Sequence, residues 1–593
     1  MFMSLFTDIH GNTMTTKRAN EKIAYSSFLQ KWVSDLTEEA AKLMQDSIPT
    51  LTYTSYEAYD SHGDREPYQQ IYFNRRKRLN TFAILLYLNP KQKEYQTHLK
   101  DILWSICEEW TWCLPAHINR DSAFTLSEKN DQAYEQIDLF SAETAFSLAE
   151  ILIMHETRLP DFIIKRIRYE VNRRIFKPFL ERQHHWEQSE HNWSSVCSGS
   201  IGASAIYLIE DDKHLQTILQ KCIHSVKYFV RGLTSEGVCM EGYHYWQYGF
   251  GYYVYFADLL YKKTAGEVNL FAHDKVKKAA TFQEKVFIDS HTVANFSDAL
   301  EQASPMLGLS HYLHHTYKTV HLPHSSICAP YGSDPCYRFA PAIRDLLWFD
   351  ETKEGTDWPT HESFFPEAQV FVKTSTYRQQ KIGFAAKGGH NDEPHNHNDL
   401  GHFMIYVNGV SLLSDLGAGH YNKDYFSPSR YQFLTNGSQG HSVPQIGGAV
   451  QASGSTFVSK EMELTPNLLS MELTCAYSVP SLSSFLRSWD LDTENGFVRL
   501  KDSFILTSPS QIKERYVSLA DVVDQSPGRL QLSRLGLKIS LLFDQNDWNL
   551  TLHHTAFQTH DGSTQTVVLI DFTYEAVHGS KDFCIDFQVD APS

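Results

Sequence analysis

The spacing of hydrophobic residues changes once along this chain, from a helical period to a strand period. In the first half, apolar residues recur at i, i+3, i+4 and i+7, which predicts amphipathic helices. The predicted helices cover residues 28–44, 80–88, 94–112, 141–156, 161–183, 201–212, 214–233 and 252–264. After residue 368 the pattern alternates, which predicts strands at 369–378, 381–389, 469–478, 537–544 and 566–575.

Two Asn-Gly pairs predict tight hairpins in the second half. Asn408-Gly409 separates the alternating runs HFMIYV and VSLLSD, and Asn495-Gly496 interrupts a longer alternating run at 484–508. Asn and Gly tolerate the positive φ that the two-residue turns of hairpins require. Antiparallel pairing is therefore expected to dominate the second half.

The predicted architecture is α+β and multidomain. Pro, Gly, Ser and Asp accumulate between residues 321 and 366, which is typical of a boundary between domains. We predict an N-terminal α-helical domain over residues 1–345 and a C-terminal antiparallel β-sandwich over residues 346–593. Paired helices of roughly 12–20 residues favour an (α/α) toroid, and closely spaced strands with polar turns favour a sandwich over βαβ units.

Composition narrows the classes of function. The chain has 593 residues, of which 42% are hydrophobic and 13% aromatic, and its formal net charge is −17. Such an acidic chain is not expected to bind nucleic acid, although a local basic cleft still allows an anionic substrate. The aromatic excess suits a carbohydrate cleft as well as a large helical core.

The expected location is the cytoplasm. Nine Cys occur singly with no CxxC pair, which suits a reducing compartment. The first 22 residues lack a basic segment followed by a long apolar core, so no signal peptide is expected. No apolar run approaches the roughly 18 residues of a membrane span, so no membrane partner is expected. A homodimer remains an open expectation.

The densest group of polar side chains that could bind a metal or catalyse a reaction lies at 388–401, in GGHNDEPHNHNDLG. The hairpin that follows would return Asp415 towards the strand that His397 leads into, and His441 lies in the later segment TNGSQGHSVP. Two imidazoles and one carboxylate form a zinc-type ligand set. If the segment is extended, His395 and His397 lie on one face, one for metal and one for chemistry. The alternative interpretation is a solvated polar turn.

Two stretches of the helical half also differ from simple core. In SEHNWSSVCSGSIGAS, His191-Asn192-Trp193 precede small residues that could begin a helix with Ser194 or Ser195 as N-cap; core packing of Trp193 and capping by Asn192 explain the motif equally well. In EGVCMEGYHYWQYGFG, the side chains of Glu241, Tyr243 and Tyr245 lie among further aromatic residues, a composition that more often lines a cleft than a core.

Two basic segments are weaker candidates. His117 and Arg120 are expected to end a helix in TWCLPAHINR. The run Arg75-Arg76-Lys77-Arg78 is most simply a solvated helix face, but its guanidinium groups could also bind carboxylates or sulfates.

Together, the motifs HNW…GAS, EGYHYWQYG and HNHNDLGHFMIYVNGVSLLSDLGAGHY, with the later NGSQGHS, resemble the heparinase II/III-like polysaccharide lyases. The resemblance spans the helical motifs to about residue 260 and the sandwich motifs from 370 to 445. It implies an (α/α) toroid joined to an antiparallel β-sandwich. It also implies β-elimination of polysaccharides that contain uronic acid.

The resemblance also assigns roles. Asn192, with His191 beside it, matches the position that neutralises the uronate carboxylate, so that a base can remove the weakly acidic C5 proton. Tyr245 matches the tyrosine that acts as base, acid or both, and His395 matches the second proton-transfer residue on the opposite face. Tyr243, two residues before Tyr245, competes for its role.

The remaining assignments concern the metal and the substrate. His397, Asp415 and His441 match the family's ligands for a structural Zn²⁺ beside the active site. The candidate substrate-binding residues are His117, His191, Glu241, Tyr243, Tyr425, Arg430 and Arg75, of which Glu241, Tyr425 and Arg430 could instead support the catalytic groups from behind.

The expected substrate is an anionic polysaccharide or oligosaccharide with uronic acid, most simply a glycosaminoglycan such as heparan, chondroitin or hyaluronan chains. Alginate is an alternative substrate. A zinc-dependent hydrolase, with Asp392, Glu393 or Asp399 as base, is an alternative enzyme. A glycoside hydrolase would need two opposed carboxylates, and Glu241 alone does not supply them. A carbohydrate-binding protein without turnover is the non-enzymatic alternative.

Overall fold

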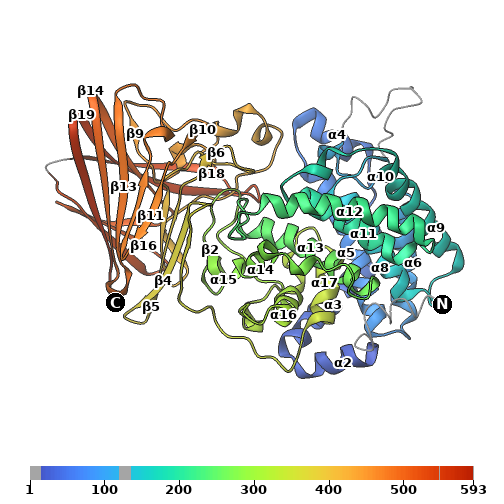
Figure 1. Cartoon of the computed structure of the whole chain (residues 1–593). Helices are drawn as coiled ribbons and strands as arrows, with labels where there is room; N and C mark the ends of the chain where they lie inside the picture. The colour runs from blue at the N-terminus through green and yellow to red at the C-terminus, as the bar shows by residue number, and fades with distance from the viewer. Residues whose placement is uncertain (1–14, 119–134, 546–547, 592–593) are drawn as a thin grey trace. The chain divides into compact units, whose positions relative to one another are not determined.

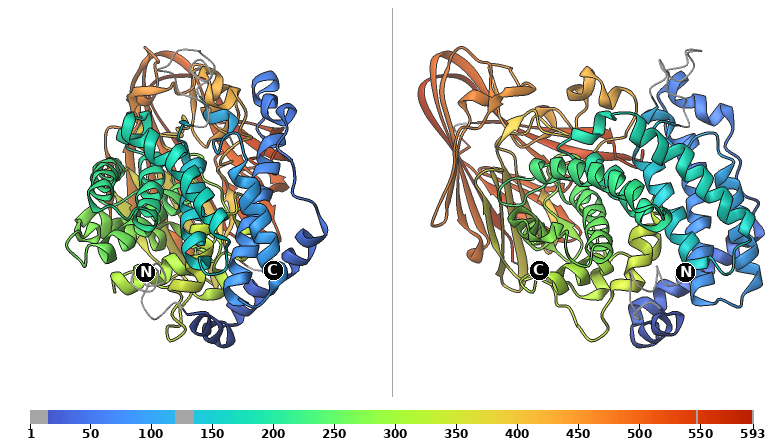
Figure 2. Two further views of the ribbon diagram at one scale, coloured as in Figure 1. Left: turned by 90° about the vertical axis from the view of Figure 1, so that its right-hand side faces the viewer. Right: turned by 45° about the vertical axis from the view of Figure 1, so that its right-hand side comes forward.

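The structure is a computed structural model that describes residues 15–118, 135–545 and 548–591 (Figure 1). Helices dominate the chain to about residue 350 and antiparallel strands dominate the rest, so the predicted fold class is confirmed. In Figure 2 the helices run from blue to yellow-green along the chain and the strands of the second half from yellow to red. Among the described helices, none combines the length and the apolar character needed to cross a bilayer.

The longer helices are α2 (Thr16–Tyr25), α3 (Ser27–Gln45), α4 (Tyr53–His62), α5 (Glu66–Leu88), α6 (Lys93–Cys107), α8 (Leu139–His155), α9 (Asp161–Val171), α11 (Asn192–Leu208), α12 (Asp212–Gly232), α13 (Tyr243–Lys263), α16 (Leu307–Thr316) and α17 (Phe339–Trp348). Shorter ones are α10 (Lys177–Glu181), α14 (Asp274–Ala280) and α15 (Phe282–Val286). A π-helical turn, η4 (Asn172–Phe176), precedes α10. Pro178 follows this turn at the start of α10 and cannot donate a helical hydrogen bond.

The strands are β1 (Phe287–Asp289), β2 (Thr292–Val293), β3 (Glu362–Phe365), β4 (Val370–Tyr377), β5 (Gln380–Lys387), β6 (His390–Asn391), β7 (Phe403–Val407), β8 (Val410–Leu413), β9 (Gln445–Ile446), β10 (Gly454–Val458), β11 (Met462–Thr465), β12 (Leu468–Glu472), β13 (Leu482–Asp492), β14 (Phe497–Ser518), β15 (Asp521–Ser526), β16 (Arg529–Arg534), β17 (Leu537–Leu542), β18 (Asn549–Gln558) and β19 (Thr564–Val589). The helical prediction for 94–112 was too long, since α6 ends at Cys107. The prediction for 80–88 was too short, since α5 begins at Glu66 and contains the basic run.

The chain forms two compact units, but not as two consecutive segments. The first unit contains Met1–Leu233, Trp246–Ala280 and Pro305–Thr356; the second contains Thr234–Tyr245, Thr281–Ser304 and Asp357–Ser593. A single boundary after residue 345, which lies inside α17, does not describe this division. Two short segments that precede the sandwich in sequence belong to the second unit, and both carry residues of the candidate site.

Close packing in the first unit depends on small residues of α11. This helix packs against α8 and α12. A Cβ atom on Gly202 would lie 2.3 Å from the ring of Phe256 on α13, and a Cβ atom on Gly249 of α13 would lie 3.0 Å from the Cβ of Asn192. The small-residue stretch after Asn192 therefore lets α11 and α13 approach each other and positions the first turn of α11.

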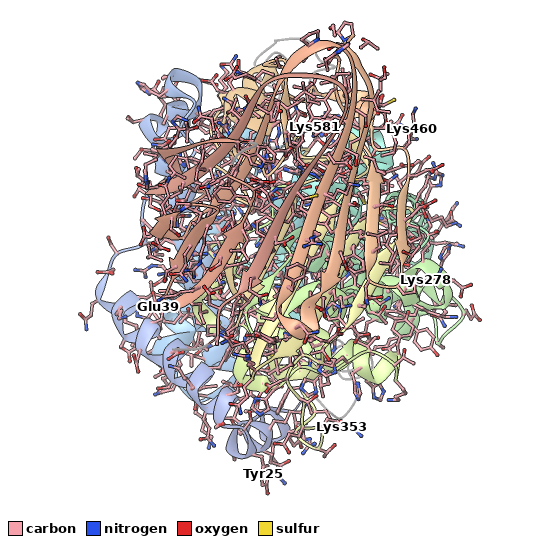
Figure 3. The ribbon with its side chains drawn as sticks, turned by 90° about the vertical axis from the view of Figure 1, so that its left-hand side faces the viewer. Tyr25, Glu39, Lys278, Lys353, Lys460 and Lys581 are labelled. Carbon is pink, nitrogen blue, oxygen red and sulfur yellow. The ribbon has the colours of Figure 1, made fainter. Side chains whose placement is uncertain are left out.

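The second unit is a sandwich of two antiparallel sheets. Five strands pair in the order β3-β4-β5-β7-β8, and a ten-stranded sheet follows β11-β12-β13-β14-β19-β17-β16-β15, with β18 and β9 attached to β19 and β14. Figure 3 faces the long strands, with Lys581 on β19. Phe384 and Phe403 from the smaller sheet pack against Trp489 of the larger one at 6.0 and 5.9 Å between ring centroids. These rings belong to the shared core between the sheets.

Both Asn-Gly hairpins are confirmed. Val407 pairs with Val410 across Asn408-Gly409, whose φ angles are 45° and 75°. Asp492 pairs with Phe497, so this hairpin also forms, but its connection is the four-residue loop 493–496 and not the two-residue turn that was predicted. The first hairpin connects β7 to β8, and β8 leads directly to Asp415.

Candidate active site and metal centre

A buried carboxylate, Asp298, is the centre of the candidate site in the second unit. Sequence reasoning did not identify it, because the surrounding segment ANFSDAL has no recognisable pattern. Its oxygens accept hydrogen bonds from five side chains: His395, His397, Tyr421, Tyr425 and Arg430. All five reside in the segment 395–430, so Asp298 joins the strand-connecting loops of the sandwich to the segment that follows β2.

His395 lies against this carboxylate in a strained conformation. Its Nδ1 is 2.6 Å from Oδ2 of Asp298, and its Nε2 is 3.5 Å from a carboxylate oxygen of Glu241. Its φ is 57° and Ser297, beside Asp298, has φ of 60°, values that L residues seldom adopt. Such strain persists where the surrounding contacts enforce it, and it concentrates at functional sites. The condition of an extended segment, on which a shared face for His395 and His397 depended, is not met at His395, although both side chains still converge on Asp298.

Tyr245 contacts His395 directly. The two rings stack with centroids 4.4 Å apart, and the Tyr245 hydroxyl lies 3.5 Å from Nδ1 of His395. The same hydroxyl is 2.8 Å from the hydroxyl of Tyr421, which in turn donates to Asp298 at 3.0 Å. Because Tyr421 uses its only proton towards Asp298, Tyr245 is the donor to Tyr421.

Tyr243 occupies a different environment from Tyr245. Its hydroxyl donates to Gln283 at 3.0 Å, and its ring packs edge-on against Phe287. It is buried in the second unit. Tyr245, which the sequence favoured over its competitor Tyr243, is therefore the tyrosine beside His395.

Tyr425 and Arg430 support Asp298. The Tyr425 hydroxyl donates to Asp298 at 2.5 Å and accepts from the side-chain amide of Asn436 at 2.8 Å. Nη2 of Arg430 lies 3.1 and 3.0 Å from the two oxygens of Asp298, and its guanidinium carbon lies 4.6 Å from the centre of the Tyr425 ring. The sequence left open whether Tyr425 and Arg430 bind substrate or support the candidate catalytic groups. Their bonds to Asp298 favour the supporting role.

The electrostatics of the site follow from burial and these contacts. Burial alone would raise the pKa of Asp298, but hydrogen bonds from His395 and His397 and the charge of Arg430 hold this pKa well below its usual range. Burial alone would lower the pKa of His395, but Asp298 and then Glu241 raise it overall. Burial raises the pKa of Tyr245 well above that of a free phenol. The site therefore holds an ionised carboxylate, a more basic imidazole and a protonated phenol.

A metal-ligand cluster lies next to this site. His397, Asp399, Asp415 and His441 each offer one ligand atom, all four atoms lie within 4.8 Å of one another, and all four residues are buried. Three of these were predicted as ligands; Asp399 joins them. Nδ1 of His397 is 3.3 Å from Nε2 of His441, and Nε2 of His441 is 3.7 Å from Oδ2 of Asp415.

The residues present fit a metal ion. Nε2 of His397 bonds to Asp298 and Nδ1 of His441 bonds to the Gly437 carbonyl, both at 2.9 Å, so the opposite ring nitrogens face the cluster. Outer hydrogen bonds of this kind orient ligating histidines. Among the described residues, Oδ2 of Asp399 and Oδ2 of Asp415 are buried without a hydrogen-bond partner, which a bound cation would satisfy.

Charge and protonation support the same conclusion. Burial lowers the pKa of His441 to about 4, so this ring is neutral and able to bind a metal at neutral pH. Burial alone would raise the pKa of Asp415, but His402, His441 and His397 lower it overall. Nε2 of His402, a residue that sequence reasoning did not single out, lies 3.3 Å from Oδ2 of Asp415.

The helical unit brings together other predicted residues. His191 is the N-cap of α11, with its Nδ1 accepting from the Trp193 amide at 3.4 Å, and Asn192 is the first residue of the helix. The prediction of Ser194 or Ser195 as N-cap was therefore wrong. The Ser195 hydroxyl donates instead to the Gly249 carbonyl, across the close contact between α11 and α13.

His117 ends the short 3-10 helix η2 (Pro115–His117) and lies in the same unit. Its Nδ1 is 2.9 Å from Oδ2 of Asp138, and its ring stacks on Phe140 and meets Trp193 edge-on at 5.1 Å. His117 and the HNW motif are therefore neighbours. Arg120, the second candidate of that segment, lies outside the described residues.

Arg75 is not part of a solvated face. It is 5% exposed, and Arg76 and Arg78 are also buried. Arg75 and Arg76 both bond to the carboxylate of Glu109 at 2.7 Å. The basic run therefore forms a buried ionic cluster inside the helical unit, in which Arg75 and Arg76 border two different cavities.

No family model and no curated protein sequence matches this chain. Solved structures do match it over nearly its whole length. A crystal structure of heparinase III aligns with a TM-score of 0.65 at 11% identity, covering 96% of this chain and 92% of that one. A mutant of a heparan sulfate lyase from Pedobacter heparinus aligns with a TM-score of 0.61 at 12% identity, covering 100% and 93%.

A chondroitin AC lyase from Streptomyces coelicolor A3, in complex with chondroitin sulphate, aligns with a TM-score of 0.56 at 10% identity, covering 100% of this chain and 82% of that one. At these identities the matches establish the fold. The chain has the helical-toroid and β-sandwich architecture of these lyases, as the resemblance of its motifs implied.

Proposed function

We propose that this protein is a polysaccharide lyase that cleaves glycans containing uronic acid by β-elimination, giving a 4,5-unsaturated uronyl product. The observation that carries the proposal is the direct contact of Tyr245 with His395 beside the ionised Asp298. This pair supplies the two proton transfers that elimination needs, within a fold that the chain shares with glycosaminoglycan lyases.

The protonation states suggest how the pair divides the work. Nδ1 of His395 is held by Asp298, which leaves Nε2 to accept the C5 proton of the uronate, and the raised pKa makes the neutral ring a stronger base. Tyr245 is a protonated phenol and donates to the O4 leaving group as the C4–O4 bond breaks. The electron pair of the C5–H bond becomes the C4=C5 double bond.

In this proposal the helical unit binds the carboxylate of the substrate. We propose that Asn192, with His191, neutralises this carboxylate, which lowers the barrier to loss of the neighbouring C5 proton. His117 is a further substrate-binding residue in this proposal. These roles rest on the resemblance of the HNW motif and on the contact of His117 with Trp193.

We assign the metal cluster to Zn²⁺ with a structural role. Two histidines with carboxylates are a common zinc set, and four buried protein ligands leave little room for a catalytic water. Zinc would supply fixed charge and rigidity, and its ligand His397 would be held against Asp298. This arrangement argues against the zinc-hydrolase alternative, which requires an open coordination position.

Glycosaminoglycans are the first substrates to test, because the structures that share the fold are named as heparinase III, heparan sulfate lyase and chondroitin AC lyase. Alginate is the second. We propose that the enzyme is cytoplasmic, because its nine Cys are free thiols. We also propose that it prefers short chains, because imported oligosaccharides would be the form of these substrates that reaches it there. Much faster turnover of intact polymer would contradict that preference.

The test is ultraviolet absorbance during incubation with heparan sulfate, chondroitin sulfate, hyaluronan and alginate oligosaccharides. A rise from the new C4=C5 bond establishes elimination and identifies the substrate. Tyr245→Phe should lower kcat by about 10²–10⁴, whereas the matched Tyr243→Phe, which loses the bond to Gln283 away from His395, should keep most of the activity. Shortened sugars without absorbance would indicate a hydrolase instead.

A further inference from the structure

The helical unit contains a cavity of about 610 Å³ that the proposed reaction does not use. It lies between the segment 48–56, helix α5 and the end of α6. Ligand pockets in proteins commonly measure about 300–1,000 Å³. The cavity is therefore large enough for a small ligand or for one or two units of a longer one.

Its walls carry aromatic rings that are accessible to solvent. Trp110 is 48% exposed and Tyr53 is 75% exposed, although large aromatic side chains are usually well buried. Tyr56 lies between them, with its ring 6.5 Å from that of Tyr53 and nearly parallel to it, and 5.6 Å from that of Trp110 in an edge-on arrangement. A flat ligand face could therefore stack on rings that the protein already holds in place.

Charged groups border the same space. The guanidinium of Arg75 is fixed by Glu109, by the Ser105 hydroxyl at 2.7 Å and by the Pro49 carbonyl at 2.9 Å. Glu108, at the end of α6, is exposed and also lines the cavity. An immobilised donor and an exposed acceptor beside aromatic rings suit a ligand with an apolar face and a polar edge.

This arrangement matches the surface of a sugar ring. A pyranose presents C–H groups on its face and hydroxyl groups around its edge, so it can stack on an indole while carboxylate and guanidinium groups bond to its hydroxyls. A purely apolar ligand would displace water from the exposed carboxylate of Glu108 without replacing its hydrogen bonds, which is unfavourable.

The cavity also shares a buried core with His117, another predicted substrate-binding residue of the same unit. Tyr56 and Tyr68, which line it, belong to a buried cluster that includes Leu114 and Ile118, on either side of η2. Phe140, on which His117 stacks, packs against this cluster. The walls of the cavity and the position of His117 are therefore set by the same core.

We propose that this cavity is a second carbohydrate-binding site, which takes a pyranose unit of a glycan chain stacked on Trp110 and Tyr53. The choice of a glycan over another ligand with a flat face rests on the proposed function. The site would take one unit of the bound glycan, so its loss should weaken glycan binding and leave the chemical step unchanged.

The experiment measures binding to the full-length Tyr245→Phe variant, which should bind glycans without converting them. Octasaccharides of heparan sulfate, chondroitin sulfate, hyaluronan and alginate are titrated by calorimetry. Adding Trp110→Ala should weaken binding of the preferred octasaccharide about fivefold or more, as expected for loss of a central aromatic contact. Glu108→Gln should weaken it less, and in the active enzyme Trp110→Ala should raise KM for long chains while kcat is kept.

Trp104→Ala is the matched control. Trp104 is 41% exposed on α6, the helix that ends shortly before Trp110, but it stacks on Phe162 and does not line the cavity. Tyr53→Ala provides a second variant at a position too exposed to be needed for folding. Equal affinities of the Trp110→Ala and Trp104→Ala variants for every octasaccharide would overturn the proposal, as would absence of binding by the parent.

The two hypotheses fail separately. If elimination is observed and Trp110→Ala has no effect, the second-site proposal is wrong and the lyase proposal stands. Glycan binding that depends on Trp110, with no ultraviolet product from any substrate, would support the second site and remove the lyase.

Discussion

Asp298 is the residue on which the candidate site depends most. It compensates the charge of Arg430 and orients His395 and His397 through opposite oxygens, Oδ2 and Oδ1. One carboxylate thus positions a proposed proton-transfer group and a proposed metal ligand. Changing it should affect metal binding and turnover together.

We predict that Asp298→Asn loses both metal and activity. The amide cannot accept from all five donors and leaves the buried charge of Arg430 uncompensated, which costs about 3–5 kcal/mol in comparable buried pairs. Loss of an outer partner of a metal-binding histidine commonly lowers metal affinity about 10–100-fold. Metal content by atomic absorption and the unfolding midpoint are the measurements.

The control for this variant is Asp392→Asn, an exposed aspartate in the same loop region as His395. It should keep full metal content and activity. A fully metal-loaded Asp298→Asn protein would show that His397 does not depend on Asp298 for its orientation.

A second prediction at this scale concerns pH. The carboxylate of Glu241 lies 3.5 Å from Nε2 of His395 and is one of the causes that raise the pKa of His395. If neutral His395 is the base, kcat/KM rises with pH as this ring loses its proton. Glu241→Gln removes a negative charge that favours the protonated ring, so the rising limb should move to lower pH.

The measurement is the pH profile of kcat/KM for the parent and the Glu241→Gln variant. Metal content should stay constant, since Glu241 is not one of the clustered ligands. A limb that stays in place or moves to higher pH would assign the titration to a group other than His395.

At the scale of elements, one hairpin and one helix start each position a residue with a proposed role. The β7–β8 hairpin returns the chain beside the loop that carries His397, so Asp415 joins the metal cluster. The close contact of α11 with α13 sets Asn192. Helix α8 has a different role: it forms much of the core of the helical unit, and it includes the fully buried His155.

We predict that α8 makes the helical unit sensitive to acid through His155. Its Nε2 lies 2.9 Å from the Ala83 carbonyl, and burial lowers its pKa to about 3. Between pH 6.5 and 3 the unfolded chain binds a proton at this residue and the folded chain does not, so stability falls as pH drops through this window. At pH 5 the loss is about 2 kcal/mol.

Urea unfolding of the parent and of His155→Gln at pH 7.5 and pH 5 measures this effect. The variant should lose less stability than the parent between the two values, by about 2 kcal/mol. His273→Gln, at an exposed position, should behave like the parent. The same loss in the parent and His155→Gln would show that other groups cause the acid sensitivity.

At the scale of the whole molecule, the proposed metal ligands and His155 belong to different compact units. Binding of an ion stabilises the part of the structure that supplies its ligands. Removal of the metal by a chelator should therefore increase hydrogen exchange in the second unit, first around residues 395–441, and leave α8 and α11 protected. Mass spectrometry of exchanged peptides measures this difference.

His397→Ala should show the same increased hydrogen exchange in the second unit without the chelator. Added Zn²⁺ should restore protection in the chelator-treated parent but not in the variant. Equal loss of protection in α8 and in residues 395–441 would contradict a metal role confined to the second unit.

Much of the fold was predictable because its signals are local. Helical and strand periods, Asn-Gly turns and the dense His/Asn/Asp segment each reflect residues close together in sequence. His397 and Asp415 could be paired before the structure was known, since only a short hairpin separates them. The buried state of the Arg75 run was not predictable, because Glu109 pairs with it across two helices.

What the sequence by itself determined is the class of the two halves, the hairpins and the residue types of the metal set. Only the tertiary structure decided that Asp298 organises the site, that Tyr245 and not Tyr243 lies beside His395, and that Asp399 joins the metal ligands. Asp298 lies 97 residues from His395 and Tyr245 lies 150 residues from it. Contacts over such separations depend on how sheets and loops pack, so a local sequence pattern does not predict them.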